Sequence, residues 1–408
     1  MLDRSGFRLI ANPRVMRAQA YAGDGRAEVL SLAALADAKR EITSWHGYKP
    51  TPLRALSKLA AASGIGSILY KDEGERFGIG SFKALGGAFA VLRLLQRHIL
   101  AGKQMQVCAQ DLSAGRYADL VSTITVTCAS DGNHGRSVAW GAHIFGCRCV
   151  IYLPDVVSQG RSRAIEGYGA EVRRVAGTFD DAVRQAAADA AAHGWHVIPD
   201  TSAGGSTEAP RDVMQGYGLI IDEALEQTRT MPSHVFAQAG VGGFAAAICA
   251  YLWERFGGER PCFVVVEPDT ADCFLRSAEA GKPTAVQGVL HTIMGGLACG
   301  EPSPLAWAVL GPGADAFATV GDGAASECMR LLAQGRFGDE PIVAGESAVA
   351  GLACALVACA DAAARRRLRL GEESHILVLG TEGATDVETY RAIVGRAPGD
   401  VLALRRAG

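Results

Sequence analysis

The sequence has almost no excess of charge of either sign. Its 408 residues include 40 Lys and Arg against 43 Asp and Glu, so the formal net charge is only −3. No block of like charge stands out that could cover a nucleic-acid backbone or an anionic membrane. We therefore expect a small molecule as the partner, and neither a nucleic acid nor a membrane.

Long apolar runs are also missing. The longest apolar segments, near 240–253 and 348–360, are shorter than the roughly 20 residues that a membrane-spanning helix needs. The first residues, MLDRSGFRLIANPRVMR, contain no apolar stretch followed by small residues of the kind found in a signal peptide. The sequence thus predicts a soluble, cytoplasmic protein.

The eleven cysteines lack the spacing of a metal site. There is no CxxC pair and no Cys/His cluster with zinc-site spacing. Most of the cysteines are flanked by apolar residues, where a free thiol behaves as a small hydrophobic side chain. We expect free thiols in a reducing compartment and no metal.

What the sequence does contain is a regular alternation of short aliphatic runs and alanine-rich stretches. The aliphatic runs predict strands at 66–73, 123–130, 147–154, 171–177, 195–200, 233–240, 262–268 and 375–383. The alanine-rich stretches predict helices at 82–99, 134–146, 179–194, 243–257 and 346–368. Such alternation indicates an α/β fold with mostly parallel sheets covered by helices. No linker marks a domain boundary, although the Gly/Ser-rich segment 201–210 predicts a loop.

One charged side chain, Lys83, stands in the apolar and glycine-rich run GSFKALGGAFA. A helix is predicted to begin there, so burial and the helix dipole would both disfavour the protonated amine. An amine that is neutral part of the time can form a Schiff base with an aldehyde. For a lone lysine, however, a side chain that reaches water along an apolar face is the commoner explanation.

The segment CASDGNHG predicts a turn between a strand and a helix. Backbone N–H groups at such a turn can bind a carboxylate, and an Asn side chain can hydrogen-bond a hydroxyl of a ligand. A helix capped by Ser or Asp explains the segment equally well. The candidate residues of this turn are Ser130, Asp131, Gly132, Asn133 and His134.

A second turn of this kind, QAGVGGFAAAI, carries Gly240, Gly242 and Gly243. These glycines would let the backbone approach an anion at the start of a helix. With Ala245 the segment also fits the GxGxxA dinucleotide fingerprint, which makes a nicotinamide-dependent dehydrogenase an alternative. That fingerprint usually lies in the first βα turn of its fold, whereas here several βα units precede it. A phosphate cradle for a compact cofactor suits the position better.

The last predicted strand ends in GTEGATD, where a hydroxyl could meet a ring nitrogen. An alcohol cannot stably protonate a pyridine nitrogen, so the ring would withdraw fewer electrons than beside a carboxylate, which suits β-elimination. Thr381 is the first candidate for this contact, and Thr385 is the alternative. The alternative is that GTEGATD is only a turn at the end of a strand and has no functional role.

In this order the four motifs resemble those of the fold type II pyridoxal 5′-phosphate (PLP) enzymes, the tryptophan synthase β-like superfamily, from about Pro50 to Asp386. Within it, SDGNHGR, VMQGYG, EPDTADCF and TEGATD are similar to the diaminopropionate ammonia-lyase family. The resemblance implies two three-layer αβα domains with twisted, mostly parallel sheets and the cofactor in the cleft between them. It implies a large domain of 1–87 and 206–408, a small inserted domain of 88–205, and a homodimer.

The resemblance also implies roles for individual residues. Lys83 would carry PLP as a Schiff base and move protons, with Asp131 and Asp200 as acid/base residues. Ser130, Gly132 and His134 would join Asp131 in binding the amino acid substrate. Contacts to the cofactor are implied for Asn133, Gly240, Val241, Gly242, Gly243, Phe244 and Thr381.

The implied reaction is α,β-elimination of 2,3-diaminopropionate, or of a close β-substituted amino acid, to pyruvate and ammonia through an aminoacrylate. A PLP-dependent serine/threonine-type dehydratase or a β-replacement enzyme is the alternative, although dehydratases usually have serine in place of Asp131. The alternative of a nicotinamide-dependent dehydrogenase would leave Lys83 and Asn133 without a task. A catalytically silent binding protein is a further alternative, against which the presence together of Lys83, Asn133 and the phosphate loop argues. The loop after Asp200 reads TSAGGSTEAP where the lyases have an aromatic and acidic stretch, so the substrate is the most open part of the prediction.

Overall fold

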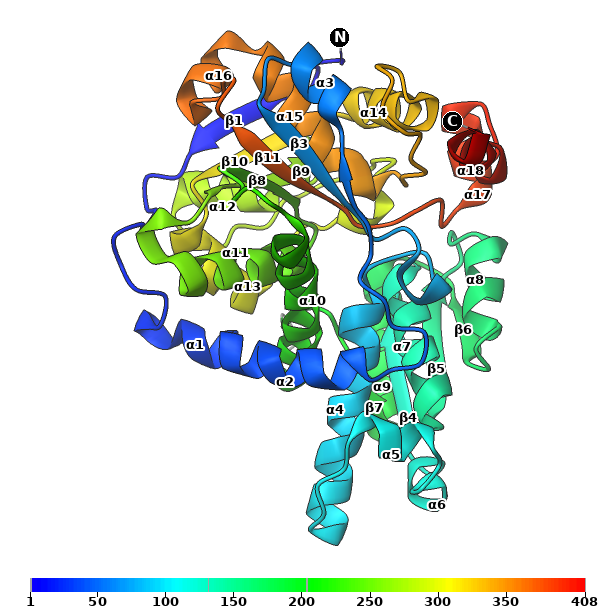
Figure 1. Cartoon of the computed structure of the whole chain (residues 1–408). Coiled ribbons are helices and arrows are strands. Elements are labelled where there is room, and N and C mark those ends of the chain that lie inside the picture. Colours follow the sequence, from blue (N-terminus) through cyan, green and yellow to red (C-terminus); the bar gives the residue numbers. More distant parts are fainter. Residues whose placement is uncertain (1, 131, 203–204, 408) are drawn as a thin grey trace. The chain divides into compact units, whose positions relative to one another are not determined.

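The computed structural model describes residues 2–130, 132–202 and 205–407. Residues 406 and 407 are described by their backbone alone. The chain divides into two compact units, in each of which helices surround a sheet (Figure 1). Unit 1 consists of Met1–Leu32, Pro50–Arg76 and Ile220–Gly408, and unit 2 of Ala33–Lys49 and Phe77–Leu219. The predicted inserted segment 88–205 falls inside the second segment of unit 2, and the domain boundaries stay a prediction.

Unit 1 is built on a seven-stranded sheet with the strand order β1-β10-β9-β8-β11-β3-β2. The outer strands β1 and β2 pair antiparallel with their neighbours, and all the other pairs are parallel. The bounds are β1 Arg8–Ala11, β2 Leu53–Ala55, β3 Ser67–Asp72, β8 His234–Gln238, β9 Cys262–Pro268, β10 Ala316–Val320 and β11 His375–Gly380.

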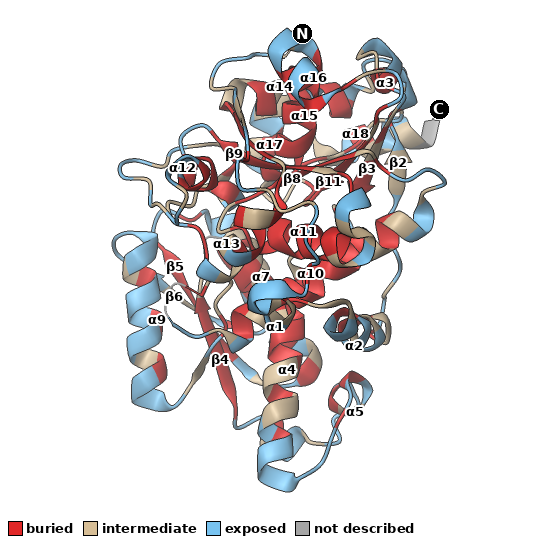
Figure 2. Cartoon of the chain, turned by 90° about the vertical axis from the view of Figure 1, so that its left-hand side faces the viewer, coloured by how far each residue is buried: buried red, intermediate tan, exposed pale blue. Residues whose placement is uncertain are grey.

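Helices cover both faces of this sheet. In β9, Val264 and Val266 belong to a core cluster that also contains the buried residues of α15, while Val265, which points the other way, is fully buried too. Side chains alternate between the faces of a strand, so a strand buried at successive positions must be covered on both sides. Figure 2 shows these central strands as buried along their length.

The helices of unit 1 lie mainly in its third segment. They are α1 Arg26–Val29, α3 Ser57–Ala62, α11 Gly243–Phe256, α12 Cys273–Ala280, α13 Pro304–Gly313, α14 Asp322–Gln334, α15 Ala350–Ala360, α16 Ala362–Leu368, α17 Val387–Val394 and α18 Pro398–Ala407. Two further helices, α2 Leu32–Thr43 and α10 Glu208–Gln227, have residues in both units.

Unit 2 is built on a four-stranded, all-parallel sheet with the strand order β6-β5-β4-β7. Val150 and Tyr152 of β5 pack against α9, whereas Ile151 lies against Gly135 of α7. The two helices therefore cover opposite faces of the sheet, which makes this unit three-layered as well. The strands are β4 Thr125–Ala129, β5 Arg148–Pro154, β6 Glu171–Val175 and β7 His196–Val197. The helices are α4 Ala84–Lys103, α5 Ala109–Ser113, α6 Ala118–Val121, α7 Asn133–Phe145, α8 Gln159–Glu166 and α9 Phe179–His193.

All eight predicted strands are present, and the prediction of a mostly parallel α/β fold is confirmed. Three further strands, β1, β2 and β10, had not been predicted. β10, with the sequence AFATV, is short and rich in alanine, so its sequence signal is weak, yet it pairs in parallel with β9 over its whole length.

The prediction of one continuous helix over 346–368 is wrong. The segment bends by 106° between Ser347–Ala360 and Ala362–Leu368. The break lies at Asp361, whose backbone is extended and whose carboxylate accepts hydrogen bonds from the N–H groups of Ala363 and Ala364. An Asp side chain that caps a new helix offers the backbone an alternative to continuing the old one.

Among the described residues, no single helix is both long enough and apolar enough to cross a membrane, and only the bent pair Ser347–Ala360 and Ala362–Leu368 meets the length and composition together.

Candidate active site

Lys83 lies at the start of α4, as the residue that caps its amino terminus. Its amine donates a hydrogen bond to Oδ2 of Asp200 at 2.9 Å, and the two side chains are 18% and 24% exposed. Asp200 stands three residues after β7, at the carboxyl end of the sheet of unit 2. The fold therefore joins the predicted cofactor lysine to the second predicted aspartate across 117 residues of sequence.

Two neighbouring side chains stabilise the ionised form of the Asp200 carboxylate. Burial opposes its ionisation, but the Lys83 amine and the nearby His134 lower the pKa of Asp200 well below its usual value of 3.8. His134 itself is only 6% exposed, and its Nε2 lies 2.8 Å from the carbonyl oxygen of Ile198, two residues before Asp200. The predicted residues Lys83, His134 and Asp200 thus form one charged cluster in unit 2.

The predicted substrate turn is organised by Ser130. Its Oγ accepts hydrogen bonds from the N–H groups of Gly132 at 3.0 Å and of Gly135 at 2.8 Å. The N–H groups of Gly132 and Gly135 are therefore already used inside the turn. Asn133 is the first residue of α7, and Asp131 lies outside the described residues.

Two aromatic side chains that sequence reasoning did not select lie beside the amine. The Nζ atom of Lys83 is 5.6 Å from the ring centre of Phe82 and 5.9 Å from that of Tyr217, and the two rings are 4.6 Å apart. Tyr217 belongs to the VMQGYG segment, which contributed to the family resemblance. The resemblance therefore marked this segment, but it assigned no function to the tyrosine. The rings give the amine an apolar wall, as the composition of the run around Lys83 had suggested.

The predicted phosphate loop lies in unit 1, between β8 and α11. Gly242 has φ +91° and caps the amino terminus of α11, and Gly243 and Phe244 are the first residues of that helix. A Cβ atom on Gly240 would lie 2.9 Å from the carbonyl oxygen of Gly296, and one on Gly242 would collide with the ring of Phe274. Glycine is thus required at both positions. Val241 completes the loop, whose N–H groups and helix start form a suitable site for an anion.

Thr381 follows β11 in unit 1 and is 4% exposed. Its hydroxyl oxygen accepts a hydrogen bond from Nε2 of Gln238 at 3.0 Å, so the hydroxyl hydrogen is left to point at another group. Thr385 differs, because its hydroxyl donates to Oε2 of Glu382 at 3.4 Å. Of the two threonines left open by the sequence, Thr385 thus directs its hydroxyl hydrogen to Glu382, whereas Thr381 is bonded to Gln238 as an acceptor. Gln238, which holds it, is a polar residue at the end of an apolar strand that sequence reasoning missed.

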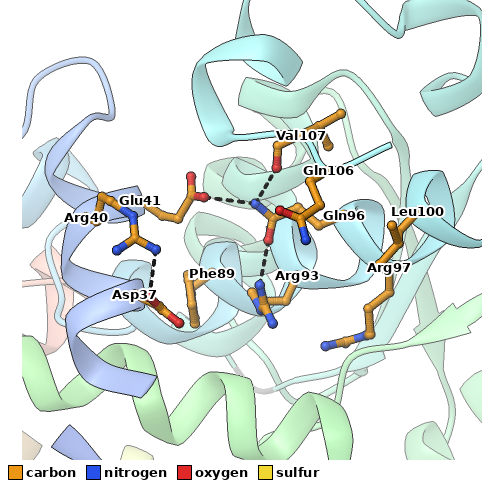
Figure 3. A pocket seen from close by; sticks show the side chains of 10 residues that line it. All are labelled: Asp37, Arg40, Glu41, Phe89, Arg93, Gln96, Arg97, Leu100, Gln106 and Val107. Carbon is orange, nitrogen blue, oxygen red and sulfur yellow. Dashed lines mark hydrogen bonds and ion pairs between the residues drawn. The ribbon is translucent and has the colours of Figure 1, made fainter. Parts of the chain in front are cut away.

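A separate pocket in unit 2, about 330 Å³ in volume, contains none of the predicted site residues (Figure 3). It is lined by side chains of α2 and α4, and its polar groups bond largely to one another: Gln96 joins Glu41, Arg93 and the carbonyl oxygen of Val107, and Arg40 joins Asp37. Within the part of the chain that the structure describes, no group of three or more His, Cys, Asp and Glu side chains is placed to hold a metal ion.

Comparison with known proteins identifies the family of the chain. The model of the family described as pyridoxal-phosphate dependent enzyme matches residues 45–382. The chain is 41% identical over 357 residues to the diaminopropionate ammonia-lyase of Escherichia coli (strain K12), covering 85% of this chain and 88% of that protein. The crystal structure of the holo form of the E. coli lyase superposes with a TM-score of 0.86 at 34% identity, covering 96% of this chain and 97% of the other. The same lyase in complex with an aminoacrylate-PLP azomethine reaction intermediate gives a TM-score of 0.84 at 36% identity, covering 97% of each chain.

Proposed function

Because the chain belongs to the pyridoxal-phosphate dependent enzymes, and within them to the diaminopropionate ammonia-lyases, we propose that it eliminates ammonia from 2,3-diaminopropionate or a close β-substituted amino acid. It is a PLP-dependent carbon–nitrogen lyase. The products would be ammonia and 2-aminoacrylate, which hydrolyses to pyruvate and a second ammonia. The single observation that carries the proposal is the ion pair between Lys83 and Asp200, since it joins an amine that can bind an aldehyde to an acid/base group.

The residues of unit 1 fit the phosphate and the ring of PLP. The loop Gly240–Phe244 would hold the phosphate, because side chains are excluded at Gly240 and Gly242 and α11 begins there. The hydroxyl of Thr381 would donate to the ring nitrogen, held in place by Gln238. In unit 2, the Asn133 side chain would bond the ring's phenolic oxygen. When bound, the cofactor supplies an electron sink for the charge left at the α-carbon.

Lys83 and Asp200 would move the protons. Each can pass a proton to the other between Nζ and Oδ2, which are 2.9 Å apart. With the Lys83 amine free, this pair would accept the α-proton and return a proton to the departing β-amino group. A carboxylate is also a suitable partner for a β-ammonium, because the charge-assisted hydrogen bond orients the leaving group.

The turn 130–134 would bind the substrate carboxylate through the N–H groups at the start of α7, while Ser130 keeps the turn in shape. His134 would maintain the charge of Asp200 from the same turn. For Asp131, the proposal of a second acid/base role rests on the resemblance alone, since this residue lies outside the described part of the chain.

The test is an assay of the purified protein for pyruvate and ammonia with D- and L-2,3-diaminopropionate, beside a visible absorbance scan. We expect the band of lysine-bound PLP, its loss in Lys83→Ala, and pyruvate from at least one isomer. A band without pyruvate would move the assignment to another β-substituted amino acid such as D- or L-serine, with the altered loop after Asp200 as the cause. The absence of a band after PLP is added would refute the proposal.

We further propose that the protein is a cytoplasmic homodimer. The eleven cysteines are all free thiols, most of them buried, which suits a reducing compartment. Light scattering coupled to size-exclusion chromatography would give the mass of the assembly, against 42.6 kDa for one chain.

A further inference from the structure

Two glycines bring α4 and α10 unusually close together in unit 2. A Cβ atom on Gly216 of α10 would collide with the carbonyl oxygen of Leu85, and one on Gly86 of α4 would lie 2.6 Å from Cζ of Tyr217. The absence of a side chain at both positions lets the ring of Tyr217 lie directly against the first turn of α4. Cζ carries the phenol oxygen, so the hydroxyl end of the ring is the part that meets this turn.

Lys83 stands at the beginning of the same turn. The N–H groups of Gly86 and Gly87 both donate to its carbonyl oxygen, at 3.1 and 3.0 Å. The backbone of Lys83 is therefore held by the very turn on which Tyr217 packs, while its amine lies 5.9 Å from the centre of the Tyr217 ring. The Tyr217 ring therefore lies near the backbone of Lys83, through the turn at Gly86, and also near its amine.

The phenol of Tyr217 is buried, with 2% of the residue exposed. Burial raises the pKa of this phenol to about 12; the Lys83 amine opposes the rise and the Asp200 carboxylate adds to it. The hydroxyl therefore stays protonated over the working range of pH and feels both partners of the ion pair. A neutral hydroxyl beside an amine and a carboxylate can accept from the first or donate to the second.

We propose that Tyr217 is a positioning residue, whose ring and hydroxyl keep the Lys83 amine beside Asp200 when the amine is not bonded to the cofactor. The inference rests on the proposed function, because it takes Lys83 as the lysine that binds PLP. Its chemical reason is that a freed lysine side chain has four rotatable bonds, whereas proton transfer needs the amine within hydrogen-bond distance of the α-carbon's proton. The rings of Phe82 and Tyr217, whose centres lie 5.6 and 5.9 Å from Nζ, restrict the positions that the amine can take.

Tyr217→Phe tests this, since it removes only the hydroxyl and keeps the ring against Gly86. The matched control is Tyr390→Phe in α17 of unit 1: Tyr390 is also fully buried, and its hydroxyl has no hydrogen-bond partner within the described residues. Two quantities are measured for both variants and wild type. One is kcat and KM for pyruvate formation. The other is the rate at which the visible band forms when PLP is added to the cofactor-free full-length protein, which needs no turnover.

We expect Tyr217→Phe to lower kcat about tenfold with little change in KM, and to slow band formation by several-fold, since the hydroxyl that interacts with the Lys83 amine and the Asp200 carboxylate is lost. Tyr390→Phe should match wild type in both. Wild-type values for Tyr217→Phe in either measurement, or an equal loss in Tyr390→Phe, would overturn the role of Tyr217. Lys83→Ala separates the two proposals: a band that persisted in that variant would remove the proposed function itself, whereas a bandless Lys83→Ala beside a fully active Tyr217→Phe overturns only this inference.

Discussion

The amine of Lys83 donates to the carboxylate of Asp200 across a distance of 2.9 Å, although the two residues are 117 positions apart. Lys83 begins a helix at one edge of the unit 2 core, and Asp200 follows the short strand β7. Their pairing places an amine and a carboxylate where a proton can pass directly from one to the other. The functional proposals depend on this pair, and the first prediction concerns it.

Asp200→Asn removes the charge of the carboxylate and keeps its shape. We expect kcat for pyruvate formation to fall about 10²- to 10⁴-fold, the usual contribution of a positioned acid/base group. The visible band of bound PLP should remain, because Lys83 is intact. Steady-state kinetics with an absorbance scan checks both, and a variant within threefold of wild-type kcat would exclude an acid/base role.

Thr381→Val should change the electronic environment of the cofactor ring. The substitution replaces the hydroxyl held by Gln238 with a methyl group of similar size. We expect a shifted visible band and a kcat about tenfold lower, because a hydrogen bond to the ring nitrogen is worth about 1–2 kcal/mol. Thr385→Val is the control, since that hydroxyl is directed to Glu382. If Thr385→Val gave the larger change, the assignment of the two threonines would be reversed.

Gly242→Ala should weaken PLP binding by at least about tenfold. The added methyl group would meet the Phe274 ring, and φ +91° is strained for any residue with a Cβ atom, at a cost of about 1–3 kcal/mol. Gly395→Ala provides the matched control, because Gly395 has φ +77° but open space around it. Fluorescence titration of the cofactor-free protein with PLP compares the two. Equal PLP affinities for both variants would show that the loop does not bind the phosphate.

Glu267 predicts a pH dependence of stability. Its carboxylate accepts hydrogen bonds from the N–H groups of Phe274 and Leu275, at 2.7 and 2.8 Å. Complete burial nevertheless raises the pKa of Glu267 from 4.5 to about 8. The folded state then binds this proton more tightly than the unfolded state, so the contribution of Glu267 to stability is greatest below pH 4.5 and falls as the pH rises toward 8.

Glu267→Gln should flatten this part of the pH profile, because Gln resembles the protonated acid. The thermal midpoint of the variant should rise relative to that of wild type between about pH 5 and 8. Thermal unfolding at several pH values measures the difference. A difference that stayed constant over this range would show that Glu267 does not change protonation on unfolding.

Glu223→Gln should destabilise unit 1 by about 3–5 kcal/mol, because the buried Lys71 amine loses its paired carboxylate and the buried Arg76 keeps only Glu73. Glu223 is 1% exposed and pairs with Lys71 at 2.7 Å and with Arg76 at 2.8 Å. Asp37→Asn breaks the exposed pair with Arg40 and should cost less than about 1 kcal/mol. Chemical unfolding of both variants compares the two costs, and equal costs would contradict the argument from burial.

Much of the fold could be predicted from the sequence because parallel α/β units leave a local signature. A strand buried on both faces reads as a short aliphatic run, as in CFVVVEP, and a covering helix as an alanine-rich stretch, as in FDDAVRQAAADAAAH. Where a segment gains its structure from distant partners, that signature fails. β10 is a strand because β9 lies beside it, and the bend at Asp361 depends on one side chain capping a new helix.

The sequence by itself determined the local chemistry of the protein: a lysine at the start of a helix, a glycine loop that only glycine can form, and a hydroxyl at the end of the last strand. Only the tertiary structure decided which groups act on that lysine. Asp200, His134 and Tyr217 come from separate turns and helices, and they are brought near Lys83 as α7 and α10 pack against α4. The physical reason is that hydrogen bonds and charge effects act over a few ångströms in space, while each of these residues is more than fifty positions from Lys83 in the chain.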